Sequence, residues 1–206
     1  MMARKTLYIV GNGPVGRDMS AEIDAADFVV RFNEPKASIG MSGVKTDILF
    51  LCNAGKPMQR RLESPDFLAS AIVRNAGQVI LAYHPIIIDR YFPKPNFLSR
   101  LKGRREDWTF ATIMALGGIG KASIVFPASF YMDGCRELGL PEDKMASVYP
   151  STGYFGIFYA LRHFSAAEWA ISLCGFSWEG WKRHAWADER KWVEDRVRQG
   201  LLTMIE

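Results

Sequence analysis

An apolar run that ends at a glycine-rich turn opens this chain and restricts its fold sharply. Leu7 to Val10 has the composition of a buried strand, and the turn that follows reads Gly11-Asn12-Gly13-Pro14-Val15-Gly16. A strand followed by G-x-G-x-x-G is typical of parallel α/β proteins, in which the turn brings backbone N–H groups close to an anion. Glu34 ends the next apolar run, where a ribose-binding acid is expected, so this turn alone predicts a flavin or nicotinamide protein.

Short apolar runs alternate with helical patterns along the rest of the chain. Each expected strand is almost continuously apolar, as in strands that are buried on both faces of a mostly parallel sheet. We predict one Rossmann-like α/β domain over residues 1–206, with a mostly parallel sheet and helices on both of its faces. The expected strands are 5–10, 27–32, 46–52, 78–83 and 168–174. The expected helices are 15–23, 67–75, 123–138 (with Pro127 kinking it or shifting its start), a helix that the stretch 149–153 opens and that ends near 164, and 188–202. Residues 85–95 and 97–112 are expected to be irregular or weakly helical, and residues 117–120 are expected to form a loop.

Cysteine content and charge exclude several classes of protein. Three cysteines at irregular spacing suggest neither a disulfide framework nor a zinc site, which predicts a reducing, cytoplasmic environment. The apolar run before Gly11 is too short for a signal peptide or a membrane span. The net charge of +4 is spread out, with pairs such as Arg60-Arg61, and predicts a solvated surface; the alternative is peripheral contact with anionic substrates or with the anionic inner membrane. No nucleic-acid-binding motif accompanies the charge, and the oligomeric state stays open.

Two asparagines mark a candidate ligand site after the first two expected strands. Asn12 lies between the glycines and Asn33 follows the second strand, so both side chains can bind one ligand if those strands are neighbours. The alternative is that both are ordinary turn residues. Against a dinucleotide, 206 residues leave little room for a second catalytic domain, and the stretch from Arg17 to Ser20 lacks the small residues that let a helix pack closely over its strand.

Two later stretches can supply anion binding and base catalysis. Pro150-Ser151-Thr152-Gly153 precedes an apolar run, so Ser151 or Thr152 is expected to cap a helix. The free N–H groups at the start of such a helix suit a carboxylate or phosphate. The alternative is an ordinary capped helix of the core that binds no ligand. His184 precedes Glu189 by five positions, and an acidic neighbour can orient a histidine that acts as a general base; the alternative is a surface histidine. The other histidines show no ligand spacing with His184, so no metal site is predicted.

In this order, the three stretches resemble the sialylmotifs of the sialyltransferases of glycosyltransferase family 29. The large motif is similar to "IVGNGPVGRDMSAEIDAADFVVRFNEPKASIGMSGVKTD", with its Val-Gly-Asn, Arg-Phe-Asn and Lys-Thr-Asp. The small motif is similar to "YPSTGYFGIFYALRHFSAAEWAISLCGF", and the very short motif to "HAWADE". The match covers about two-thirds of the chain, from its two ends.

The resemblance implies a GT-A-like variant of the Rossmann-like fold and a metal-independent, inverting glycosyltransferase that uses a CMP-sugar donor and a glycan acceptor, with no cofactor. Asn12 and Asn33 would hold the phosphate and ribose of the donor. Ser151, Thr152 and Gly153 would bind it through hydroxyl and N–H groups, most plausibly at the carboxylate of its sugar. The catalytic residues implied are His184, as the general base, and Glu189, as its support; the further candidate site residues are Gly11, Gly13, Tyr149, Gly175 and Trp181.

Several positions depart from the family pattern. The family's disulfide is absent, because its two places fall near Leu7 or Tyr8 and at Phe164. The stretch 177–183 offers no counterpart to the histidine of the third motif that contacts phosphate, and Trp181, Lys182 or Arg183 is the candidate substitute. The implied protein is a minimal bacterial relative without membrane anchor or stem, whose donor is sialic acid or a related acidic sugar such as Kdo. A nucleotide-binding protein without transferase activity and a small dinucleotide-binding protein stay open as alternatives.

Overall fold

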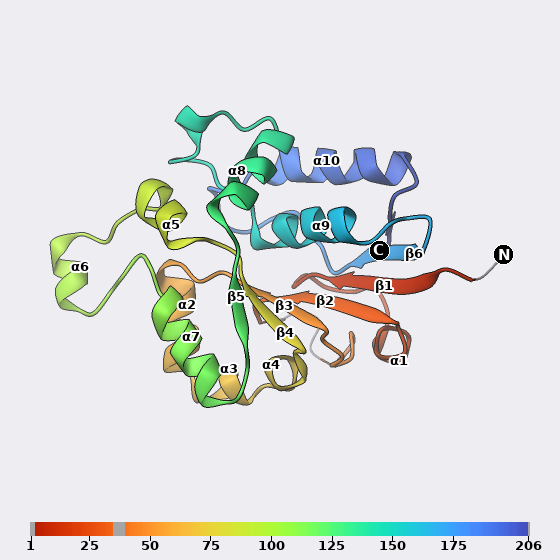
Figure 1. Ribbon diagram of the computed structural model, residues 1–206, viewed down its shortest axis with the longest axis horizontal. Coiled ribbons are helices and arrows are strands. Elements are labelled where there is room, and N and C mark those ends of the chain that lie inside the picture. Colours follow the sequence, from red (N-terminus) through yellow and green to blue (C-terminus); the bar gives the residue numbers. More distant parts are fainter. Residues whose placement is uncertain (1–2, 35–39, 206) are drawn as a thin grey trace.

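The computed structural model describes residues 3–34 and 40–205, and in these residues seven parallel strands form one sheet (Figure 1). The strand order is β5-β4-β3-β2-β1-β6-β7, and every neighbouring pair is parallel, which confirms the predicted fold class. Positions 35–39, inside the large-motif match, lie outside the described residues. The strands are β1 (Lys5–Val10), β2 (Phe28–Phe32), β3 (Ile48–Leu51), β4 (Gln78–Leu81), β5 (Ser123–Val125), β6 (Trp169–Cys174) and β7 (Thr203–Met204).

Helices cover both faces of this sheet, as parallel connections require. In Figure 1, α8, α9 and α10 lie on one face, and α1, α3, α4 and α7 lie on the other. The helices are α1 (Ser20–Asp24), α2 (Gly55–Glu63), α3 (Pro65–Ala69), α4 (Ala71–Asn75), α5 (Pro85–Tyr91), α6 (Phe97–Leu101), α7 (Thr109–Gly118), α8 (Ala128–Glu137), α9 (Thr152–His163) and α10 (Trp186–Arg198), with a short 3-10 helix at Glu142–Lys144.

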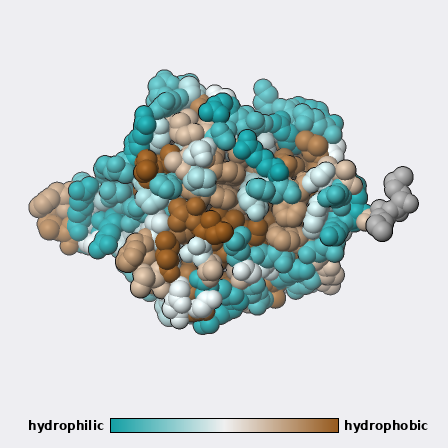
Figure 2. Space-filling model, in the orientation of Figure 1, coloured by the Kyte–Doolittle hydropathy of each residue, from teal (hydrophilic) through white to brown (hydrophobic). Residues whose placement is uncertain are grey.

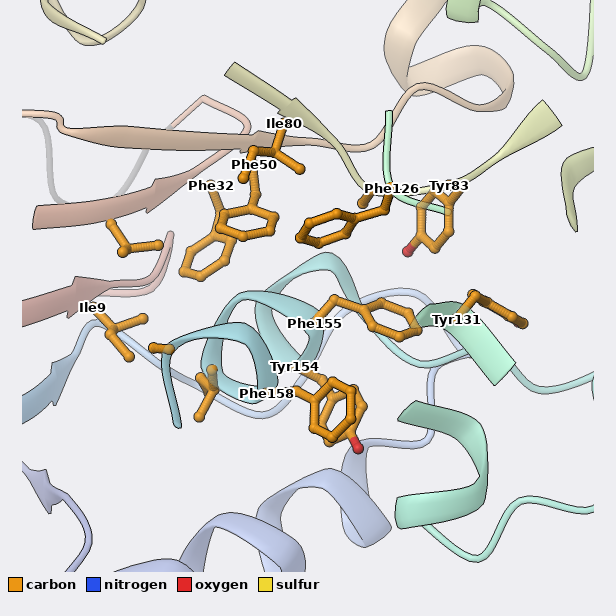
Figure 3. Packing of buried hydrophobic residues seen from close by; sticks show 14 of the residues in the cluster. Ile9, Phe32, Phe50, Ile80, Tyr83, Phe126, Tyr131, Tyr154, Phe155 and Phe158 are labelled. Atoms are coloured by element: carbon orange, nitrogen blue, oxygen red, sulfur yellow. The ribbon is translucent and has the colours of Figure 1, made fainter. Parts of the chain in front are cut away.

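The core follows from the alternation of side chains along each strand. In β1, Leu7 and Ile9 face the cluster that packs on α9, while Tyr8 and Val10 face the cluster that packs on α1. Figure 3 shows the α9 side of the sheet, where aromatic rings from several elements meet. The rings of Phe50 and Phe126 lie 5.5 Å apart between their centroids there. Because both faces are buried, each strand needs apolar residues at successive positions, which is the pattern seen in the sequence.

The order of the strands reverses between β1 and β6, and this point positions the site. The chain moves outward from β1 through β5 and then returns to place β6 on the other side of β1. In such sheets, ligands bind in the crevice at the carboxyl ends of the strands where the order reverses. The turn after β1 and Gly175 after β6 meet there, with Asn33 after the neighbouring β2.

The helix predicted over 15–23 is wrong for most of its length, since α1 covers only Ser20–Asp24. Hydrogen bonds to distant parts of the chain hold the preceding residues in an irregular path. The N–H of Gly13 donates to the carbonyl of Gly175 at 2.7 Å, and the N–H of Met19 donates to the carbonyl of Met41 at 2.8 Å. Pro14 therefore lies in a loop and not in a first helical turn.

Three further predictions of secondary structure differ from the structure. Residues 123–138 form β5 and then α8, because Pro127 ends the extended segment and serves as the N-cap of α8. Residues 85–95 and 97–112, expected to be irregular or weakly helical, contain α5, α6 and the start of α7, and α7 continues to Gly118, inside the stretch 117–120 that was expected to form a loop. The single helix predicted over 67–75 is two short helices, with Ser70 capping the second by accepting from the N–H of Val73. The helix α2 and the strand β7 were not predicted.

Candidate functional site

A cavity of about 710 Å³ lies at the carboxyl ends of the central strands. This volume falls within the range of small-molecule binding sites. Of the residues predicted from the sequence as site candidates, all line it except Glu34, Tyr149, Lys182, Arg183 and Glu189. The structure thus brings together, from distant parts of the sequence, Gly11, Asn12, Gly13, Asn33, Ser151, Thr152, Gly153, Gly175, Trp181 and His184.

The glycine turn after β1 packs against the loop after β6. The N–H of Gly11 donates to the carbonyl of Cys174 at 2.8 Å, and that of Gly13 donates to the carbonyl of Gly175. A Cβ atom on Gly11 would lie 2.2 Å from the carbonyl oxygen of Gly175, so only glycine fits there. The N–H groups of Gly11 and Gly13 are therefore not free for an anion, because the protein's own carbonyls occupy them.

Asn12 and Asn33 present different groups to the cavity. Asn12 is exposed on the turn between the two packed glycines. Asn33 has a left-handed backbone conformation (φ 49°), and its side-chain oxygen accepts a hydrogen bond from the N–H of Cys52 at 2.9 Å. With that oxygen bound, the amide Nδ2 of Asn33 is the group left for a ligand. Glu34, the candidate ribose-binding acid, is not among the described residues that line the cavity.

Ser151 is the N-cap of α9, as the sequence predicts. Its hydroxyl accepts from the N–H of Tyr154 at 3.0 Å and donates to Glu189 Oε2 at 2.6 Å, while its own N–H donates to Glu189 Oε1 at 2.7 Å. Both donors of Ser151 are therefore occupied. The N–H groups of Thr152 and Gly153, in the first turn of α9, make no hydrogen bond to any described residue, so they are the donors that a ligand anion can use.

Glu189 is fully buried and links the starts of two helices. Its carboxylate binds Ser151, 38 positions earlier, and thereby holds the start of α9 against the start of α10. Both of its oxygens bind Ser151, so Glu189 acts on the segment that carries His184 through the start of α9. Burial raises the pKa of Glu189 to about 7, and the hydrogen bonds from Ser151 act in the opposite direction.

The imidazole of His184 is fixed in orientation by backbone and aromatic contacts. Its Nδ1 lies 3.0 Å from the carbonyl oxygen of Tyr149, and a carbonyl can only accept, so Nδ1 carries the proton. Nε2 is then the basic nitrogen. The rings of Trp181 and Trp186 stand edge-on to it, with centroids 5.2 and 4.8 Å away. Burial lowers the pKa of His184, which keeps the ring neutral and able to accept a proton near neutral pH.

Tyr149 supports His184 from behind the cavity wall. Its backbone carbonyl accepts from both His184 Nδ1 and the N–H of Ala185, the latter at 3.3 Å. Its buried ring stacks on the indole of Trp181 at 5.4 Å between centroids. Tyr149 thus positions the histidine without lining the cavity itself.

Arg61 is the charged group that the sequence did not reveal. It lies in the last turn of α2 and lines the cavity, and its Nε and Nη1 are buried without a hydrogen-bond partner among the described residues. Burial lowers the pKa of this guanidinium, while Glu34 and Cys52 favour its charged form. In the sequence, the pair Arg60-Arg61 is typical of a solvated surface. Only the packing of α2 shows that Arg61 faces the cavity while Arg60 is exposed to solvent. An unpaired cation in a cavity is a candidate anion-binding group.

Aromatic side chains that follow β6 form another part of the cavity wall. Phe176 and Trp178 follow β6 and stack with their ring centroids 5.4 Å apart. Trp178 has a left-handed backbone conformation (φ 54°), which is strained for a bulky residue and turns the chain back toward the cavity. The density of aromatic residues in 176–186 was the available sequence signal. Such rings suit the faces of a base or a sugar.

Within residues 3–34 and 40–205, no group of three or more histidine, cysteine or acidic side chains is placed to hold a metal ion. In the same part of the chain, no helix has both the length and the apolar character needed to cross a membrane.

The fold is similar to that of solved sialyltransferases. A mammalian sialyltransferase in complex with Gal-beta-1-3GalNAc-ortho-nitrophenol superposes with a TM-score of 0.58 at 16% identity, covering 98% of this chain and 70% of that chain. The sialyltransferase CstII from Campylobacter jejuni, in complex with CMP-3FNeuAc, gives a TM-score of 0.51 at 12% identity, covering 98% of this chain and 81% of that one. At these identities the likeness establishes a sialyltransferase-like fold.

A curated relative matches over the whole length of the chain. No family model matches the sequence. The urease operon 23 kDa accessory protein of Rhizobium meliloti (strain 1021) is 31% identical over 215 aligned positions, which cover 100% of this chain and 94% of that protein. This chain therefore belongs to the family of the urease operon 23 kDa accessory protein.

Proposed function

We propose that this protein is a metal-independent, inverting glycosyltransferase that moves sialic acid or a related acidic sugar from a CMP-sugar to a glycan hydroxyl. The observation that carries the proposal is the arrangement of His184: a partly buried imidazole with a lowered pKa, whose Nδ1 is held by a carbonyl, in the same cavity as Asn12 and Asn33. A sialyltransferase-like fold and the order of the three motifs support it.

The donor is proposed to lie between the turn after β1 and the start of α9. Asn12 and the Nδ2 amide of Asn33 bind its ribose and phosphate. The N–H groups of Thr152 and Gly153 bind the carboxylate of its sugar, where the dipole of a twelve-residue helix favours an anion. Because a CMP-sugar carries one phosphate and no pyrophosphate, a single cationic side chain can balance its charge without a divalent ion.

Arg61 is the proposed cationic partner of that phosphate. A guanidinium makes charge-assisted hydrogen bonds to phosphate oxygens, and two of its N–H-bearing atoms lack partners among the described residues. The stretch 177–183 offers no histidine for this role. Arg61 therefore takes the place that Trp181, Lys182 or Arg183 was expected to fill.

Transfer proceeds by displacement at the anomeric carbon. The acceptor oxygen forms a bond to that carbon while the bond to the phosphate oxygen breaks, and CMP leaves with the electron pair. His184 Nε2 takes the proton of the acceptor hydroxyl, and the imidazolium that forms donates through Nδ1 to Tyr149. A positioned base of this kind contributes roughly a hundredfold to ten-thousandfold in rate.

Substitution of His184 tests the proposal. His184→Ala is expected to remove transfer while leaving the affinity for CMP nearly unchanged, because the imidazole acts on the acceptor. Asn12→Ala is expected to weaken CMP binding. Calorimetry with CMP, UMP, GDP and NAD should show a preference for CMP. Full turnover by the His184 variant, or a preference for NAD, would contradict the assignment.

A second candidate function is a nucleotide-binding accessory role without transfer. It is favoured by the relative, which is named an accessory protein of a urease operon. In that case the cavity binds CMP but the purified protein neither transfers nor hydrolyses a CMP-sugar. Release of CMP from a CMP-sugar, with and without glycan acceptors, separates the two functions.

A further inference from the structure

The helix α6 presents its apolar side chains to solvent. Phe97, Leu98 and Leu101 are 74, 69 and 70% exposed, and no residue of α6 is buried. Figure 1 shows α6 on a loop that extends away from the sheet, and Figure 2 shows brown and tan side chains at this end of the molecule. These side chains gain no burial from folding, so the segment 93–105, called the α6 tip below, has the character of an interaction surface.

Basic residues surround this apolar cluster. The α6 tip contains five basic residues and no acidic one, although the net charge of the whole chain is only +4. Lys102 and Arg104 are exposed and form no ion pair with any described residue. The basic residues of the tip are Lys94, Arg100, Lys102, Arg104 and Arg105.

We propose that the α6 tip is an interfacial anchor that docks this protein on an anionic lipid membrane. Phe97, Leu98 and Leu101 enter the boundary between headgroups and acyl chains, and the basic residues contact lipid phosphates. Both contributions are needed, because one apolar anchor alone binds weakly and reversibly. A second copy of the chain fits less well, since pairing two tips would place like charges together.

The α6 tip also borders the cavity. Lys94 and Pro95, before α6, and Arg104 and Arg105, after it, are among the residues that line the cavity. Docking through the tip therefore holds the mouth of the cavity at the lipid surface. Membrane binding needs no donor or acceptor, so it can be measured whether or not the proposed transfer occurs.

Sedimentation with lipid vesicles tests the proposal. The full chain is mixed with vesicles of phosphatidylcholine alone or with phosphatidylglycerol, and bound protein is measured at low and high salt. We expect binding only to the anionic vesicles, weakened by salt. The double variant Lys102→Gln with Arg104→Gln should bind anionic vesicles roughly 25-fold more weakly, because each lost cation lowers the affinity about fivefold. The matched control, Arg74→Gln with Lys191→Gln, should bind like the unaltered protein because both residues are exposed outside the tip.

A second pair of variants tests the apolar contribution. Phe97→Ser with Leu101→Ser should lower the affinity for anionic vesicles by about tenfold or more, whereas Ile124→Ser, at a position that is 47% exposed in the edge strand β5, should not. Unchanged unfolding midpoints keep the comparison valid. Failure of the unaltered protein to bind, or equal binding by the tip variants, overturns the proposal. A dimer in sedimentation velocity that Phe97→Ser with Leu101→Ser dissociates would overturn it in favour of self-association.

Discussion

Replacement of Arg61 by methionine has two opposite consequences, and together they test the anion-binding role. Methionine keeps the length and the helix propensity of the side chain but removes the charge and the N–H donors. If Arg61 binds the phosphate of the donor, the variant loses a charge-assisted hydrogen bond of about 1.5–3 kcal/mol. That loss weakens CMP binding roughly 10- to 150-fold and leaves the affinity for cytidine, which has no phosphate, almost unchanged.

The same substitution should stabilise the protein without ligand. Two atoms of Arg61, Nε and Nη1, are buried without a partner among the described residues, and a buried donor in that state costs about 1–3 kcal/mol. Part of this gain is offset, because the cation near the C-terminus of α2 interacts favourably with the helix dipole by about 0.3–1 kcal/mol. We therefore expect the free energy of unfolding to rise by about 1–2 kcal/mol in Arg61→Met.

Arg60 supplies a matched control for both measurements. It precedes Arg61 in α2 and is exposed, so Arg60→Met should change neither CMP affinity nor the free energy of unfolding by more than about 0.5 kcal/mol. Calorimetry with CMP and cytidine, and denaturant unfolding without ligand, give the two results. Equal losses of CMP and cytidine affinity in Arg61→Met, together with lower stability, would identify Arg61 as a structural residue and refute this reasoning.

Three further predictions concern residues around the site. The folded-state pKa of Glu189 lies above its ordinary value of 4.5, so the stability that this group contributes is present below about pH 4.5 and is lost as the pH rises to about 7. Glu189→Gln should remove this pH-dependent loss of ~3 kcal/mol in denaturant unfolding. Gly11→Ala should lower the free energy of unfolding by about 3 kcal/mol, because the new methyl group clashes with the carbonyl of Gly175. Gly117→Ala should raise the free energy of unfolding slightly, because open space surrounds that helical position and alanine favours a helix. Thr152→Pro removes one backbone N–H at a helix position that tolerates proline, whereas the control Thr152→Ala keeps that N–H. Calorimetry should therefore show that the proline variant binds a CMP-activated acidic sugar more weakly than the alanine variant does. Equal affinities would contradict the role of α9.

The parts of the fold predicted well from sequence are those that depend on local pattern. The strand at Lys5–Val10 and the cap at Ser151 were predicted at their observed positions, because continuous apolar runs and a Pro-Ser-Thr start are local signals. The meeting of Asn12 and Asn33 at one cavity could also be expected, since the carboxyl ends of neighbouring parallel strands share one edge, whereas only the family resemblance implied that His184 joins them.

The parts that were missed depend on contacts between distant residues. The burial of Arg61 depends on how α2 packs, because two adjacent arginines in a polar helix do not show from sequence which side chain is turned into a cavity. The contact of Glu189 with Ser151 joins residues 38 positions apart, whereas the spacing of Glu189 to His184 suggested a local role. Hydrogen bonds of the glycine turn to the loop after β6 likewise replaced a predicted helix with a packed loop.

Besides the cations of the α6 tip that border the cavity, two groups in it lack a hydrogen-bond partner among the described residues, and they bear on the class of donor. The start of α9 supplies the N–H groups of Thr152 and Gly153, although Glu189 already occupies the donors of Ser151. Arg61 supplies a full charge from α2. A CMP-activated acidic sugar carries two anionic groups, a phosphate and a carboxylate, so it can satisfy both features at once. In the proposed pose, a nucleotide with a neutral sugar and one phosphate would pair with Arg61 and leave the N–H groups at the start of α9 without an anion. These two groups therefore support the proposal that the transferred group is an acidic sugar.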